Sequence, residues 1–437
     1  KQAGRIYLVM ALIGEAALVT ALFLAVHTAG STAIRDMAAA TAISPHRDLI
    51  ICSAWIGFGV KAGAFLLHFW LPLAHPVAPT PASAVLSGCM IKAGFLGWLH
   101  FLPLGLVALP AWGTALTLFG IVALYFGVLA GLGEPRPKTI LAYSSISQMG
   151  LMTVPLGLGL AYAPGWPQLL PVILLLVFNH TLAKGMLFLT AGMAYRTGKA
   201  MSARGLLLAC AAFPALALAG LPWTGGAAAK AGLKKHLASS DLIWTFPLEL
   251  LLLLSSTGTM LLLGHFLLRL KDTLPNQEKR TEFRLWIPFL VLLPFLVLAQ
   301  DWTMHLSGQV LHLKKTEIIE DIIAGWPVLL GVLLLLPFRI ICRECVLPPR
   351  ISWSTVNTHV VGAIDRALLA LDLFGPKDTP LWRYVAHKYA RWFVPDVADP
   401  DMLLRLEKRF LHWYSMALVF MLLLSVFVFV MYWEVIG

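Results

Sequence analysis

The sequence has little charge for its length. Only 13% of its 437 residues are Asp, Glu, Lys or Arg, whereas average soluble domains contain about 25%. Hydrophobic residues make up 59% of the chain, and its mean hydropathy is +0.80. A soluble protein of this composition would have too little polar surface to cover it, so that class is excluded. The high hydrophobic content also excludes a disordered chain. It leaves a multi-pass membrane protein whose apolar runs of about 20 residues cross the hydrocarbon as helices.

Cysteine is scarce, which excludes a disulfide framework. Cys342 and Cys345 form a lone C-x-x-C, with no second pair to complete a zinc or iron–sulfur site. The chain also has no G-x-G-x-x-G motif in a strand–helix context. We therefore expect no cofactor, no metal site and no redox centre in this chain. The net charge of +11 lies in short loops, which is typical of topology signals rather than of a nucleic-acid partner.

Long apolar runs dominate the sequence, and eleven of them are long enough to span a membrane. They cover residues 5–27, 49–71, 80–103, 112–133, 137–161, 167–195, 204–236, 243–270, 285–305, 322–342 and 411–436. Proline and glycine interrupt several of them, above all the L-P-W-T-G-G run at 221–226 and the proline-rich run at 72–81. Such breaks are tolerated only where protein or an internal cavity satisfies the freed backbone groups. The sequence thus predicts an all-α membrane protein with broken helices.

The distribution of Lys and Arg predicts the orientation. Twelve of them fall on the side that carries Lys1 and six on the other, so the positive-inside rule makes the first side cytoplasmic. The same count places residues 343–410 on the cytoplasmic side. This region mixes apolar and basic residues between prolines, a pattern that favours short helices lying along the membrane surface. A solvated linker is the alternative interpretation.

Ionisable side chains inside the apolar segments are the strongest functional signal, because such groups are costly in hydrocarbon and by default mark an ion or proton path. Snorkelling to the interface explains Lys234 and Lys235. It does not explain three lysines that lie deep in their segments, namely Lys61, Lys92 and Lys230. The intramembrane ionisable residues are Glu15, Lys61, His68, Lys92, His180, Lys184, Lys230, Glu249 and His265.

Two pairs in this set have helical spacing. His68 follows Lys61 by seven residues, close to two helical turns, and Lys184 follows His180 by four. Each pair is therefore predicted to share one face of a helix. A series of such groups can relay protons, because each one changes charge at modest cost when a carboxylate or water lies nearby.

Four ordered motifs resemble the antiporter-like subunits of respiratory complex I, Mrp cation/proton antiporters and membrane-bound hydrogenases. The first is W-I-G-F-G-V-K-A-G-A-F-L-L-H-F-W-L-P-L-A-H-P-V-A-P-T-P-A-S-A-V-L-S-G-C-M-I-K-A-G at 55–94. K-T-I-L-A-Y-S-S-I-S-Q-M-G, F-N-H-T-L-A-K-G-M-L-F-L-T-A-G and L-P-W-T-G-G-A-A-A-K follow at 138–150, 178–192 and 221–230. The resemblance covers about residues 5–305, while 306–437 is similar only in layout.

The resemblance implies an antiporter-like fold of two inverted repeats, each with a broken helix and a central lysine. By this likeness, Lys61 and Lys230 are the central lysines, Lys92 is a linking lysine, and His180 with Lys184 connects the halves. Glu15, His68 and Lys138 are supporting candidates. The implied domains are 1–103 (the remainder of the first repeat), 104–270 (the second repeat), 271–342 (additional transmembrane helices), 343–410 (the cytoplasmic lateral region) and 411–437 (the final helix).

The family's glutamate partner for the first lysine lies on an earlier helix, which would fall before residue 1. Five helices of the usual layout are thus expected in an absent part of this chain or in a separate polypeptide. Glu15 lies one helix later than that glutamate and is a candidate substitute. Counted from the sixth helix, the eleven segments end at the sixteenth, the number found in the longest complex I member.

Three functions remain open. The leading hypothesis is a proton- or cation-translocating subunit of a larger membrane complex, such as a complex I-like oxidoreductase, a hydrogenase or an Mrp-type antiporter. Its partners would be other membrane subunits, soluble redox subunits, the lipid bilayer and H⁺ or Na⁺, in a bacterial or archaeal cytoplasmic membrane. The alternatives are a membrane module or anchor for a soluble partner, for example in inorganic-carbon uptake, and a stand-alone cation/proton antiporter.

Overall fold

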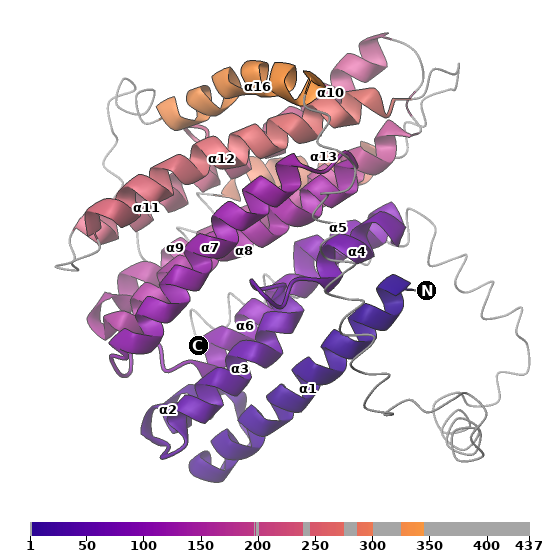
Figure 1. Ribbon diagram of the computed structural model, residues 1–437. Coiled ribbons are helices and arrows are strands. Elements are labelled where there is room, and N and C mark those ends of the chain that lie inside the picture. Colours follow the sequence, from indigo (N-terminus) through magenta and orange to yellow (C-terminus); the bar gives the residue numbers. More distant parts are fainter. Residues whose placement is uncertain are drawn as a thin grey trace, which may run out of the picture.

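The computed structural model describes residues 2–195, 197, 201–238, 245–274, 286–299 and 325–344, and the regular structure of these residues is helical, without a β-strand. The helices are α1 (Gln2–Ala29), α2 (Met37–Ile43), α3 (Arg47–Ala62), α4 (Trp70–Val77), α5 (Thr80–Val85), the π-turn η2 (Leu86–Met90), α6 (Ile91–Phe101), α7 (Pro110–Leu132), α8 (Pro137–Ala161), α9 (Trp166–Ala194), α10 (Met201–Ala219), α11 (Gly225–Ala238), α12 (Thr245–Asp272), α13 (Ile287–Val297) and α16 (Trp326–Glu344). The long helices run side by side, with α1 at one edge of the bundle and α16 at the opposite edge (Figure 1).

Within the described residues, five helical stretches are long and apolar enough to cross a membrane. They are Ile6–Ala29, Thr80–Phe101, Pro110–Leu132, Ala163–Ala194 and Pro247–Asp272. All five coincide with segments predicted from the sequence, and the prediction of an all-α, multi-pass membrane protein is confirmed. The segment predicted at 411–436 and nearly all of the lateral region at 343–410 lie outside the described residues.

Two of the predicted segments are built from paired helices separated by a break. The segment at 204–236 divides into α10 and α11, and the left-handed backbone of Gly220 (φ 93°) and Trp223 (φ 61°) separates them where the L-P-W-T-G-G run predicted. The earlier segment divides into α3 and α4. Its break falls at residues 63–69, where Gly63 and Leu66 have positive φ. The proline-rich run at 72–81 contains a second interruption at residues 78–79, between α4 and α5, as the sequence predicted. Prolines 72 and 76 are accommodated inside α4.

Helices α7 and α8 pack closely because glycine faces glycine along their contact. A Cβ atom added at Gly150 would lie 2.5 Å from the carbonyl oxygen of Gly120, and one added at Gly120 would lie 2.8 Å from that of Gly150. Gly113 and Gly127 approach α8 equally closely, one on each side of this crossing. Small residues at such contacts let two backbones approach in a membrane, where packing drives helix association.

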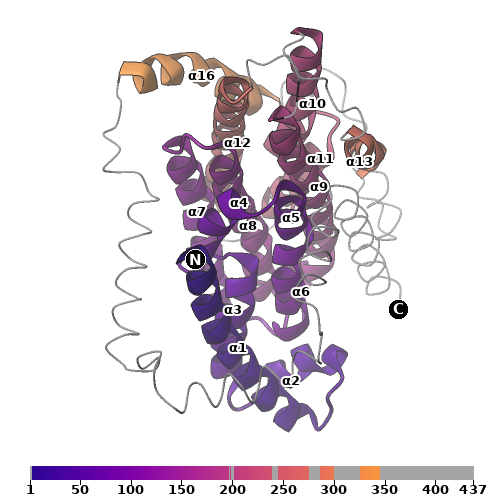
Figure 2. The same cartoon turned by 90° about the vertical axis from the view of Figure 1, so that its right-hand side faces the viewer.

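The helices α8 and α9 form the interior of the bundle. Every residue of the apolar stretch of α9 is buried, whereas only 22% of that of α1 is. In the view of Figure 2, α8 lies between α7 and α9. Polar groups on α8 and α9 are therefore enclosed by protein, while those on α1 and α3 lie at one edge of the described structure.

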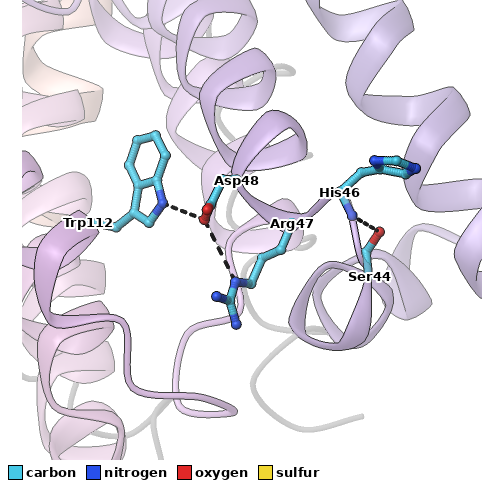
Figure 3. A network of polar contacts seen from close by, with 5 residues as sticks. All are labelled: Ser44, His46, Arg47, Asp48 and Trp112. Atoms are coloured by element: carbon cyan, nitrogen blue, oxygen red, sulfur yellow. Dashed lines mark hydrogen bonds and ion pairs between the residues drawn. The ribbon is translucent and has the colours of Figure 1, made fainter.

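A polar network joins the beginnings of α3 and α7 at one end of the bundle (Figure 3). The indole N–H of Trp112 donates to Oδ1 of Asp48 at 2.9 Å, and Nε of Arg47 lies 3.8 Å from the same oxygen. The backbone N–H of His46 donates to the hydroxyl of Ser44 at 3.2 Å. Tryptophan beside charged residues is typical of the membrane–water boundary, so this network marks the end of both helices.

Candidate functional site: lysines inside the helix bundle

Lys61 forms an ion pair with Glu15. Its Nζ donates to Oε1 of Glu15 at 2.5 Å, which joins the last turn of α3 to the middle of α1. The two side chains are 41% and 56% exposed on the edge formed by α1 and α3. Glu15, which the sequence offered as a substitute partner for this lysine, is therefore in direct contact with it.

His68 does not share a helical face with Lys61, because α3 ends at Ala62 and the backbone is irregular up to residue 69. The spacing of seven residues therefore does not place Lys61 and His68 on one face of a helix. The imidazole is 2% exposed and lies among the rings of Phe65, Phe69 and Phe126, with centroid distances of 5.9, 4.8 and 4.9 Å. Neither of its nitrogens has a hydrogen-bond partner among the described residues. His68 is thus enclosed by aromatic rings.

Lys92 is fully buried, and its ammonium is held by a π-turn. The backbone N–H of Ile91 donates five residues back to Leu86, so the carbonyl of Ser87 loses its usual partner four residues on. Nζ of Lys92 donates to this carbonyl oxygen. The irregular turn η2 therefore supplies the acceptor that a buried ammonium requires.

His180 and Lys184 lie one turn apart on the uninterrupted helix α9, as their spacing predicted. Lys184 is fully buried, and its Nζ donates to the carbonyl oxygen of Leu141 on α8 at 2.8 Å. His180 is 1% exposed, and its ring nitrogens have no hydrogen-bond partner among the described residues. Lys92 and Lys184 are close enough for their charges to interact.

Lys230 sits in the second broken segment, one turn after the start of α11. Its Nζ donates to the carbonyl oxygen of Ala219 at 2.9 Å and to Oγ of Ser256 on α12 at 2.8 Å. Because Gly220 and Trp223 end the helix, no regular helical turn follows Ala219 to occupy its carbonyl. The break therefore leaves an acceptor for the ammonium.

Lys138, at the start of α8, uses a similar acceptor. Its Nζ donates at 2.8 Å to the carbonyl oxygen of Ala78, the residue that ends α4. Four of the five lysines thus donate to main-chain carbonyls, three of which lie where a helix ends or becomes irregular. Lys184 and Lys230 bond to different groups in the described structure.

Sequence reasoning did not single out the serines that take part in these contacts. Ser256 receives the ammonium of Lys230, and Ser145 on α8 lies 2.8 Å from Ser87, oxygen to oxygen. A signal was present in the Y-S-S-I-S-Q run of α8, because several hydroxyl groups inside an apolar segment need internal partners. No group of three or more His, Cys, Asp or Glu side chains that could hold a metal gathers in the described part of the chain.

The described residues form a helical bundle with apolar helices long enough to span a membrane, two broken segments and lysines bonded inside it. Residues 1–261 match the family model described as NADH:quinone oxidoreductase/Mrp antiporter, TM. The match covers more than half of the chain, and the chain therefore belongs to this family. The family resemblance of the four sequence motifs is thus confirmed.

Curated relatives of the chain belong to several membrane complexes. Hydrogenase-4 component B of Escherichia coli is 34% identical over 198 residues, which is 44% of this chain and 30% of the relative. The putative antiporter subunit mnhA2 of Staphylococcus epidermidis is 30% identical over 313 residues, which is 65% of this chain and 39% of the relative. The chain therefore spans about a third of the length of these relatives.

Two solved structures share the fold. The Mrp complex from Dietzia sp. DQ12-45-1b superimposes with a TM-score of 0.60 at 22% identity, covering 91% of this chain and 47% of that chain. The membrane-bound sulfane sulfur reductase, an archaeal respiratory membrane complex, gives 0.61 at 20% identity, with 93% and 76% covered. At these identities the likeness concerns the fold alone.

Proposed function

We propose that this chain conducts protons or other cations as a membrane subunit of a multisubunit complex. In this proposal Lys61, Lys92, Lys184 and Lys230 change protonation in turn, and His180, one turn before Lys184 on α9, is a further candidate for the relay. Glu15 forms the ion pair with Lys61. Lys138 connects the relay to the end of the bundle, and His68 is the weakest member because aromatic rings surround it.

One observation carries this proposal: lysines lie inside a membrane-spanning bundle with their ammonium groups bonded to oxygens of the same bundle. Lys92 and Lys184 have no exposed surface at all. A purely structural role does not explain them, because apolar residues of similar volume pack such positions at no desolvation cost. Ionisable groups retained in this setting are typical of proton and ion paths.

The partners and orientation follow from the family and the charge distribution. Relatives include a hydrogenase component and an antiporter subunit, which supports other membrane subunits, and soluble redox subunits in some complexes, as partners. The excess of Lys and Arg supports a cytoplasmic location for Lys1 and for residues 343–410 in a bacterial or archaeal cytoplasmic membrane. Energy would come from a partner or from an ion gradient.

The proposed domain division follows the two broken segments. Residues 1–103 contain α3 and α4 with Lys61, and residues 104–270 contain α10 and α11 with Lys230. Each unit thus has one lysine beside one helix break, as expected for two inverted repeats. Residues 271–342 add further helices, 343–410 form the lateral region, and 411–437 form the last transmembrane helix.

Proton flux through the native complex in proteoliposomes tests the function. A potassium diffusion potential imposed with valinomycin drives the flux, and trapped pyranine reports the internal pH. We expect Lys230→Ala to abolish flux while the complex assembles normally. Lys234→Ala is the matched control, because Lys234 is an exposed lysine on the same helix, and it should conduct normally. Wild-type flux in assembled Lys230→Ala protein would overturn the proposal.

The same experiment separates the alternatives. A membrane module that only anchors a soluble partner would retain its function after Lys230→Ala and show no flux in the wild type. A stand-alone antiporter would conduct after purification without any other subunit. The proposed subunit requires both the lysine and its complex.

A further inference from the structure

Two serine hydroxyls that contact each other lie between the carbonyl groups to which the two fully buried lysines bond. Nζ of Lys92 donates to the carbonyl of Ser87, whose own Oγ lies 2.8 Å from Oγ of Ser145. Ser145 donates to the carbonyl oxygen of Leu141 at 3.0 Å, and Lys184 donates to that same oxygen at 2.8 Å. Lys92 thus bonds to a backbone atom of Ser87, and Lys184 shares the carbonyl of Leu141 with the hydroxyl of Ser145.

Three elements of the buried interior bring these groups together. Ser87 belongs to the π-turn η2, Ser145 to α8 and Lys184 to α9. Both serines are fully buried. Because Ser145 donates its one hydroxyl proton to Leu141, it accepts from Ser87. Each hydroxyl has further lone pairs and is therefore able to accept a proton from one side and donate one to the other.

The geometry points to the Ser87–Ser145 hydroxyl pair as the proton bridge between Lys92 and Lys184, an inference that rests on the proposed function. For transfer, the Lys92 ammonium turns from the Ser87 carbonyl to the Ser87 hydroxyl and donates a proton to its oxygen. The Ser87 proton passes to Ser145, and the Ser145 proton passes to neutral Lys184. Lys92 ends neutral, Lys184 ends charged, and both serines keep one proton each.

The charges of the two lysines suit such a bridge. Two ammonium groups that repel each other in a low-dielectric interior favour a state in which only one carries a proton. A proton that moves between Lys92 and Lys184 therefore needs a path whose groups are neutral before and after the transfer. Hydroxyls meet this requirement because they pass a proton on while remaining neutral before and after the transfer.

His180 offers the competing path, since it lies one turn before Lys184 on α9 and interacts electrostatically with both lysines. Its nitrogens make no hydrogen bond to the described residues, whereas the two serine hydroxyls are hydrogen-bonded to each other. Variants of the serines and of His180 therefore distinguish a hydroxyl bridge from an imidazole bridge.

The experiment measures valinomycin-driven proton flux of the whole complex in proteoliposomes, with pyranine trapped inside. We expect Ser87→Ala and Ser145→Ala each to lower the flux by about tenfold, or roughly 1.4 kcal/mol on the barrier. The double variant should be no slower than the slower single variant, because one gap already breaks the bridge. The ratio of flux in H₂O to that in D₂O should also change in both single variants.

Ser147→Ala is the matched control. Ser147 lies on the same helix, is equally buried, and its hydroxyl has no hydrogen-bond partner among the described residues. This variant should conduct like the wild type with an unchanged isotope ratio. Assembly of each variant is checked by co-migration of the complex, so that a folding defect is not mistaken for a transport defect.

The outcomes distinguish failure of the hydroxyl bridge from failure of the proposed function. Wild-type flux in Ser87→Ala and Ser145→Ala, together with lost flux in His180→Ala, would overturn the hydroxyl bridge and leave the lysine relay standing. Additive losses in the double variant would also overturn it, because they indicate separate packing effects. Flux that is insensitive to Lys230→Ala would instead refute the proposed function itself.

Discussion

The Glu15–Lys61 pair allows a quantitative test of the environment at the edge formed by α1 and α3. The pair is 2.5 Å long and lies about halfway along α1, yet its side chains remain 56% and 41% exposed in the described structure. Bulk water at this edge would make the pair worth about 0–1 kcal/mol. A water-poor environment would make the loss of one partner cost about 3–5 kcal/mol.

We expect a coupling energy of about 2 kcal/mol, between these limits, because the pair is partly enclosed and lies at membrane depth. A double-mutant cycle of Glu15→Gln, Lys61→Gln and both together gives this energy directly. The assay is unfolding of the chain in lipid–detergent micelles with increasing SDS, followed by the fluorescence of its 15 tryptophans.

The exposed pair of Arg35 and Asp36 is the control, since its atoms are 3.8 Å apart and Arg35 is 89% exposed. Asp36→Asn should change the unfolding free energy by less than about 0.5 kcal/mol. A coupling energy below about 0.5 kcal/mol for Glu15 and Lys61 would refute the reasoning, because the pair would then behave like one in bulk water.

Three other predictions use different parts of the chain. Gly150→Leu should prevent close packing of α7 and α8 and destabilise the chain by about 3 kcal/mol or more, measured by the same SDS unfolding. Trp70→Phe removes the indole donor that bonds to the carbonyl of Val60 at 2.8 Å and should cost about 1–2 kcal/mol, without loss of assembly. Single cysteines placed at 353 and 382 should react with a membrane-impermeant maleimide in inverted vesicles and not in intact cells.

The sequence predicted most of the helices because hydrophobic length is a strong signal in a membrane protein. The boundaries of α8 coincide with the predicted segment at 137–161, and those of α9 lie within one residue of 167–195. The break before α11 was also predictable, because L-P-W-T-G-G combines a proline with two glycines. Composition and local sequence suffice for these features.

The position of the first break was not predictable in the same way. The proline-rich run at 72–81 marks the interruption at residues 78–79, although prolines 72 and 76 fit inside α4, but it gives no sign of the earlier break at 63–69. Tertiary contacts stabilise this break, since the side chain of Trp70 donates to the carbonyl of Val60 across it. A contact between residues ten positions apart leaves no mark in hydrophobic periodicity.

The sequence predicted which residue types make up the site, but not the groups to which they bond. Charged groups in apolar segments identified the lysines, because their cost in hydrocarbon does not depend on the details of the fold. Their acceptors are mostly backbone carbonyls, which every residue carries, so no side-chain pattern could indicate them. The π-turn at 86–90 is a further example, because nothing in L-S-G-C-M distinguishes it from a regular helical turn.

For Lys92 and Lys230, helix irregularity and lysine placement share one physical cause. The carbonyls inside a regular helix already accept backbone hydrogen bonds, so a buried ammonium beside it must share an acceptor, as Lys184 does at Leu141. The π-turn frees the carbonyl of Ser87 for Lys92, and the end of α10 frees that of Ala219 for Lys230. These neutral acceptors hold the ammonium without a permanent counter-charge, so the lysine remains free to give up its proton. Lys61, by contrast, bonds to the carboxylate of Glu15.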